Sequence, residues 1–136
     1  MGTARPMTDQ ASVGGTDSFE LWTAEVGPVL EALVAVSKSA QRAVSQGQGS
    51  VLAASDQLKA QSRHIMSWLP THPSPYADIN WLLARTARSY AALARLFAKQ
   101  AHNSSGINLG ALDRETRGTN RALSKTMATI RDLKGT

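Results

Sequence analysis

Apolar residues recur at three- and four-residue steps through four long segments, and this spacing is the feature that most constrains the fold. In the first segment the series runs from Phe19 through Trp22 and Val26 to Leu33. An α-helix completes a turn in about 3.6 residues, so such a series lies along one face. Residues 50–69, 77–102 and 109–133 repeat the pattern. The spacing therefore predicts an all-α protein of four amphipathic helices.

The segments between these periodic stretches are short and rich in helix-breaking residues. Residues 47–49 hold two glycines, residues 70–75 hold three prolines, and residues 103–106 read Asn-Ser-Ser-Gly. Short connections between long helices favour antiparallel neighbours. We therefore expect an antiparallel up-down four-helix bundle formed as a single domain by residues 16–136. Residues 1–15 show no periodicity and are predicted to be a flexible N-terminal tail.

Local signals predict where individual helices begin. Asp17 followed by Glu20 three residues later fits a capping box and predicts the start of the first helix there. Pro28 lacks a backbone N–H group and predicts a kink or a restart within that helix. Ser50 is the expected cap of the second helix, and Gly118 is the expected weak point of the fourth.

Several function classes are disfavoured by composition. The chain has no cysteine, which excludes disulfides, thiolate metal sites and cysteine nucleophiles. The N-terminus has no apolar core of a signal peptide, and no apolar run approaches the ~20 residues that span a bilayer. We therefore expect a cytoplasmic protein, or a component of a particle assembled there, with no signal peptide and no transmembrane segment.

The residue types of common enzyme and cofactor sites are not found at the required spacing. Di-metal helical bundles need Glu-x-x-His pairs on two helices, and no Glu of this chain is followed by His at that step. His64, His72 and His102 are far apart along the predicted helices. No phosphate-binding loop, dinucleotide fingerprint or nucleophile elbow occurs. We expect no catalytic residue, no metal site and no bound cofactor.

Charge is partitioned along the chain. Residues 1–80 carry a net charge of −2 and residues 81–136 a net charge of +7, within a formal total of +5. The cations of the second part recur at helical spacing, away from the apolar stripes of their helices. They form two stripes: Arg85, Arg88, Arg95 and Lys99 on the third helix, and Arg114, Arg117, Arg121 and Lys125 on the fourth. Adjacent antiparallel helices would merge these stripes into one basic face. The alternative is an ordinary solvated surface.

Aromatic residues are predicted to gather at one end of the bundle. In an up-down arrangement Phe19, Trp22, Trp68, Tyr76 and Trp81 share that end. Phe19, Trp22 and Trp68 are expected to pack the end of the bundle. Trp81 projects on the opposite side from the apolar face of its own helix, toward the arginine stripe. It is interpreted either as a binding anchor or as a residue covered by the proline-rich connector.

These patterns favour a non-catalytic interaction or assembly module, such as an adaptor, a chaperone or a structural subunit of a larger particle. Its basic face would dock an acidic protein partner or assembly. One alternative is a sequence-nonspecific nucleic-acid-binding protein using the same face. A second is a ligand-binding bundle or enzyme at the aromatic end, near His64, His72 or Asp78. A homo-oligomer is compatible with all three.

Overall fold

The computed structural model describes residues 7–135, and its elements are helical throughout that range. The long helices are α1 (Met7–Ala43), α2 (Gln48–Trp68), α3 (Ala77–Ala101) and α4 (Leu109–Gly135). A short 3₁₀ helix, η1 (Leu69–Thr71), follows α2 directly. No strand occurs in residues 7–135, so the expected all-α class is confirmed.

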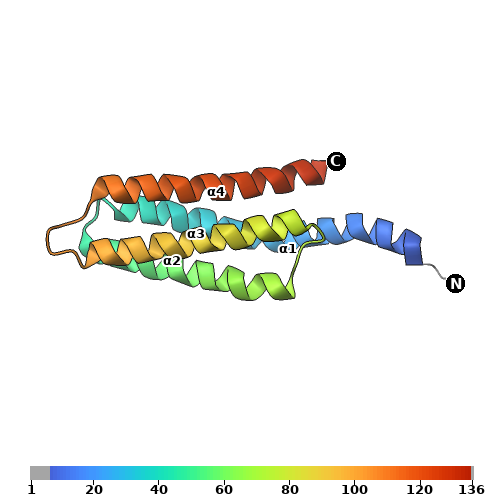
Figure 1. Ribbon diagram of the computed structural model, residues 1–136, viewed down its shortest axis with the longest axis horizontal. Coiled ribbons are helices and arrows are strands. Elements are labelled where there is room, and N and C mark those ends of the chain that lie inside the picture. The colour runs from blue at the N-terminus through green and yellow to red at the C-terminus, as the bar shows by residue number, and fades with distance from the viewer. Residues whose placement is uncertain (1–6, 136) are drawn as a thin grey trace.

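The four long helices run side by side, and successive connections lie at alternate ends of the molecule (Figure 1). Each helix packs against its neighbour in sequence, and α4 also packs against α1. This arrangement confirms the antiparallel up-down bundle. It also places α1 and α3 across the core from each other.

The core is built from the predicted apolar stripes. Leu33 of α1, Leu58 of α2, Leu83 of α3 and Leu112 of α4 are completely buried. Burying a side chain of this size stabilises the fold by about 1.5–3 kcal/mol. The stripes therefore supply both the driving force and the orientation of each helix.

Hydroxyl groups join neighbouring helices within this core. Ser55 and Ser62 of α2 donate hydrogen bonds to backbone carbonyls of α3, at Ala94 (2.8 Å) and Ala87 (2.7 Å) respectively. Small residues at these contacts let α2 and α3 lie close together. Because the buried hydroxyls are hydrogen-bonded, they avoid the desolvation cost of an unpaired polar group.

The start of α1 differs from the predicted start. The helix begins at Met7 rather than at Asp17, so it includes residues 7–15 of the segment predicted to be a tail. Residues 1–6 of that segment lie outside the described part of the chain. The first turns of α1 extend past the ends of the other helices (Figure 1). The capping-box spacing therefore falls inside a helix, and residues 7–16 contain no proline that would end the helix before Asp17.

The predicted restart at Pro28 is also wrong, since α1 is one continuous helix through this residue. Proline removes a single backbone hydrogen bond. Val26, Val29 and Leu30 on either side are buried in the core and hold the helix together there.

The beginning of α2 is set by glycine rather than serine. Gly47 has a φ of 103° and is the residue before the helix, and its carbonyl accepts a hydrogen bond from the Val51 amide (3.1 Å). Ser50 therefore lies in the first turn and is not the cap. The positive φ, which glycine tolerates without strain, reverses the chain before Ser50 is reached.

The connector after α2 begins with a helical turn, although residues 70–75 hold three prolines. Leu69–Thr71 form the 3₁₀ turn, and the His72 amide donates to the carbonyls of Trp68 (2.9 Å) and Leu69 (3.1 Å). Pro70 has no amide hydrogen, so it cannot continue the hydrogen-bond series of α2, and the chain passes into the 3₁₀ turn.

Candidate interaction surface

All eight predicted basic-face residues are exposed to solvent. Those of α3 span its outward surface from the edge beside α4 to the edge beside α2, and the α4 residues lie on the exposed side of that helix. The eight residues are Arg85, Arg88, Arg95, Lys99, Arg114, Arg117, Arg121 and Lys125.

Cations from α3 and α4 meet in the groove between these helices. Arg85 of α3 lines this groove together with Arg121 and Lys125 of α4, around a volume of about 250 Å³. Thr86 and Gly118 are among the small residues that leave the space open, and no carboxylate lines it. The groove thus brings together three positive charges from the two predicted stripes.

Gly118 gives the Arg121 side chain room at this groove. A Cβ atom at position 118 would lie 3.7 Å from Nη2 of Arg121, so the guanidinium passes directly over the glycine. This is ordinary van der Waals contact, and the backbone there does not require glycine.

Trp81 is exposed rather than covered by the connector, with 55% of its surface accessible. The guanidinium carbon of Arg85 lies 5.2 Å from the centre of the indole ring. This is the distance of a cation–π contact, which attracts a guanidinium to the face of an aromatic ring. Trp81 and Arg85 therefore form one amphipathic feature at the edge of the α3–α4 groove.

Carboxylate partners are scarce on this surface. Arg117 forms a 2.9 Å salt bridge with Asp113 one turn earlier in α4. Both side chains are more than half exposed, so the pair contributes little to stability. Among the residues whose side chains are described (18–135), the other seven predicted cations have no ion-pair partner.

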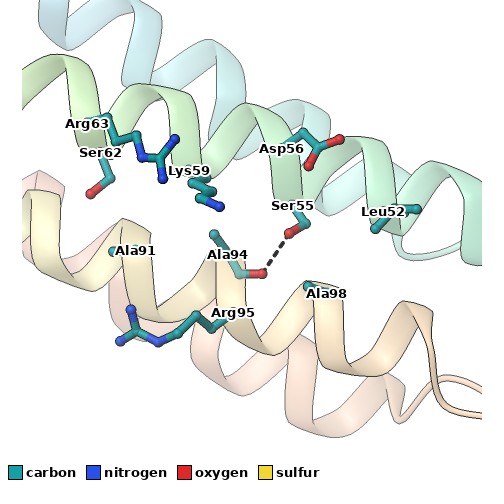
Figure 2. Close-up of a pocket in the computed structure, with 10 residues that line it drawn as sticks. All are labelled: Leu52, Ser55, Asp56, Lys59, Ser62, Arg63, Ala91, Ala94, Arg95 and Ala98. Carbon is teal, nitrogen blue, oxygen red and sulfur yellow. Dashed lines mark hydrogen bonds between the residues drawn. The ribbon is translucent and has the colours of Figure 1, made fainter.

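Arg95 borders a different groove from the one lined by Arg85. This groove lies between α2 and α3 and is also lined by Lys59 and Arg63 of α2 (Figure 2). This groove has a volume of about 430 Å³. Asp56 lies at its edge without an ion pair to Lys59 or Arg63. The single predicted face thus extends over two grooves.

Lys59 and Arg63 were missed by the sequence argument, which placed the basic face on α3 and α4 alone. Their four-residue separation puts them on one side of α2. The sequence feature that could have placed them beside another helix is the position of Ser55 and Ser62 on that same side of α2. Small polar residues in a helix often mark a close helix contact.

The aromatic end is a packed cluster. Phe19 stacks on Trp22 with ring centres 6.0 Å apart and meets Tyr76 edge-on at 4.9 Å, while Trp68 lies 6.2 Å from Trp22. The Trp22 indole N–H donates to the His72 carbonyl (2.6 Å). These contacts anchor the connector to α1. They confirm the expectation that Phe19, Trp22 and Trp68 pack the end of the bundle.

In the described residues, the titratable side chains near these aromatics do not form a cluster that resembles a catalytic or metal site. The His72 ring stacks on Trp68, and its Nδ1 atom lies 2.8 Å from the Thr71 hydroxyl and 3.1 Å from the Trp68 carbonyl. His64, His102 and Asp78 are exposed at separate places. Within the described part of the chain, no group of three or more His, Asp or Glu side chains is placed to hold a metal ion.

Comparison of the chain with models of known families, with curated proteins and with solved structures gives no match. In residues 7–135, none of the helices has the length and apolar character needed to cross a membrane.

Proposed function

We propose that this protein is a non-catalytic interaction or assembly module that docks an acidic partner through its basic face on α3 and α4. The observation that carries the proposal is the groove lined by Arg85, Arg121 and Lys125 without a carboxylate. Unpaired cations held close together repel one another, and an anionic partner relieves that repulsion. Arginine suits this role because its planar guanidinium binds a carboxylate through two hydrogen bonds.

Trp81 supports a protein partner in particular. An exposed tryptophan is an unusual surface residue, and tryptophan and arginine are enriched among the residues that dominate binding energy at protein interfaces. Stacking on the indole holds Arg85 in place before binding. Less side-chain freedom is then lost when the partner arrives.

Affinity capture from the native source tests the proposal, with mass spectrometry and nucleic-acid detection as readouts. The wild-type chain is compared with Arg88→Glu combined with Arg121→Glu. The matched control is Lys38→Glu combined with Arg42→Glu, which makes the same charge change at exposed positions of α1. We expect the first variant to lose its specific partner and the control to keep it. Equal recovery by both variants would overturn the proposal.

Sequence-nonspecific nucleic-acid binding is the second candidate, favoured by the same three unpaired cations. Phosphate contacts release condensed counterions, so the affinity for nucleic acid falls steeply with salt. Nuclease treatment before capture separates the two candidates: a nucleic-acid ligand is lost, whereas a directly bound acidic protein remains.

A further inference from the structure

The charge of α1 is opposite to that of the rest of the molecule. Residues 7–37 contain no lysine or arginine, and their acids are Asp9, Asp17, Glu20, Glu25 and Glu31. Residues 38–136 contain fourteen of the fifteen Lys and Arg residues and five acids. The molecule therefore has an acidic helix attached to a basic three-helix body.

The outward face of α1 combines carboxylates with an apolar side chain. Glu20 and Glu25 are exposed, and Leu21 between them is 68% accessible, the highest value among the exposed large hydrophobic residues of the described part of the chain. At helical spacing the three residues lie within a sector of about 140°. The pattern is that of a binding face with an apolar centre and an anionic rim.

Within one chain these carboxylates do not reach the basic grooves. Helix α1 packs against α2 and α4 and lies across the bundle from α3. In the part of the chain with described side chains, the salt bridge of Arg117 and Asp113 is internal to α4, and none joins α1 to another helix. Both charged surfaces of the molecule are thus left for contacts between molecules.

The α2–α3 groove has the complementary composition. Leu52, Ala91 and Ala98 provide apolar lining, and the hydroxyls of Ser55 and Ser62 are already bonded to α3 carbonyls. The lining therefore leaves no buried polar group for a partner to satisfy. Lys59, Arg63 and Arg95 supply three cations at its edge, against the single carboxylate of Asp56 (Figure 2).

We propose that a second copy of this chain docks the acidic face of its α1 in the α2–α3 groove. Leu21 would contact the alanine lining, while Glu20 and Glu25 would pair with Lys59, Arg63 and Arg95. Leu21 and Glu25 border an open hollow beside connector residues 71–75, which leaves them accessible to a neighbouring molecule. The two surfaces differ, so the contact is head-to-tail and forms a ring or a filament. This inference uses a different groove from the one that carries the proposed function, shares only Arg95 with the basic face, and does not rest on that function.

The contact is tested in the purified 136-residue protein by sedimentation velocity, with two variants that reverse the charge on opposite sides of the contact. Variant one is Glu20→Lys with Glu25→Lys, and variant two is Arg63→Glu with Arg95→Glu. In ~0.05 M salt we expect the wild type to self-associate with rising concentration, and in ~0.5 M salt to dissociate. Each variant alone should associate at least ~tenfold more weakly. Their equimolar mixture should associate again, because the lysines of one face the glutamates of the other.

Matched controls separate the contact from a general effect of net charge. Glu115→Lys with Asp132→Lys makes the same charge change on α4 as variant one, and should still associate. Glu20→Gln with Glu25→Gln removes the same two charges without introducing repulsion and should also weaken association. This variant replaces variant one if variant one fails to fold. A wild type that stays monomeric at every concentration in low salt would overturn the inference, as would a mixture that does not associate. Neither result would affect partner capture through α3 and α4.

Discussion

Tyr90 brings a phenol hydroxyl into the completely buried centre of the core. Its hydroxyl donates to the Leu33 carbonyl of α1 (3.1 Å) and shares a second, short hydrogen bond with the Ser37 hydroxyl. Because the phenol has one proton, Ser37 donates to it when the phenol donates to Leu33. This small network ties α3 to α1 across the bundle and fixes their relative position along the axis.

Replacing Tyr90 by Phe removes this network while keeping the ring. The Ser37 hydroxyl is then left buried without its partner. We expect the free energy of unfolding, measured by urea denaturation, to fall by about 1–3 kcal/mol. Tyr76→Phe is the control, since Tyr76 is 40% exposed and should change stability by less than ~0.5 kcal/mol. Equal stability of Tyr90→Phe and wild type would contradict this account of the core.

The same residue predicts a pH dependence. Burial raises the pKa of the Tyr90 phenol above its ordinary value of 10.0, and the hydrogen bond with Ser37 partly offsets this by lowering it. Because the folded-state pKa is raised, there is a pH range in which the Tyr90 phenol is still protonated in the native protein but ionised in the unfolded chain. The stabilisation is therefore complete below about pH 10 and is lost as the pH rises through the folded-state pKa. Urea denaturation should show a steeper loss of stability above pH ~10 for wild type than for Tyr90→Phe, and identical slopes would contradict this.

At the scale of helices, the later boundaries were easier to predict than the earlier ones. Helix α4 begins at Leu109, as expected, and the Asn108 side chain caps it by accepting a hydrogen bond from the Ala111 amide (3.0 Å). Proline at position 75 similarly disfavours helical geometry at Ser74, and the extended Tyr76 is the residue before α3. The signals at Asp17 and Ser50 were misleading, because a favourable cap does not prevent preceding residues from continuing a helix.

The candidate surface was predictable to the extent that it depends on single helices. Periodicity alone shows that Arg85 and Arg95 point away from the core. It does not show that Arg85 borders α4 while Arg95 borders α2, because that depends on how neighbouring helices are rotated against each other. Lys59 and Arg63 were missed for the same reason.

Gly118 offers a test of how α4 is stabilised. The position has helical geometry, and an added Cβ would meet only the end of the flexible Arg121 side chain. Gly118→Ala should therefore raise the free energy of unfolding by up to about 1 kcal/mol, the difference in helix propensity between the two residues. Thermal or urea denaturation checks this. Gly110→Ala, in the first turn, should gain less because helix ends fray. A destabilised Gly118→Ala would mean that the Arg121 side chain cannot move.

The molecule as a whole separates opposite charges onto different helices. An acidic α1 lies on one side, and the cationic helix α3 lies across the core from it. Helix α3 contributes Arg85 to one groove and Arg95 to the other. A partner on the α3–α4 face and a second copy on the α2–α3 groove would thus bind on either side of the same helix.

Salt dependence distinguishes the kinds of partner at this scale. A protein interface anchored by Trp81 combines apolar contact with charge contacts, so its affinity should fall less steeply with salt than that of a nucleic acid, and Trp81→Ala should weaken it by about 2 kcal/mol. A duplex nucleic acid contacted through its phosphates should instead give a steep linear fall of log affinity with log salt, and little response to Trp81→Ala. A titration at several salt concentrations with both proteins measures these effects. A steep slope with an unchanged Trp81→Ala affinity would exclude the protein interface in favour of nucleic acid.

The most direct test is the affinity of the captured partner, measured by titration calorimetry for wild type and two charge-reversal variants. Arg88→Glu with Arg121→Glu places two negative charges on the proposed face, at exposed positions where the fold should lose only about 0.5 kcal/mol per site. We predict that this variant binds its partner weaker by several kcal/mol, a loss of affinity of ~100-fold or more. Lys38→Glu with Arg42→Glu, the same charge change on α1, should bind within ~threefold of wild type. If both variants bind as tightly as wild type, the cations of α3 and α4 are a solvated surface and the proposed docking face is wrong.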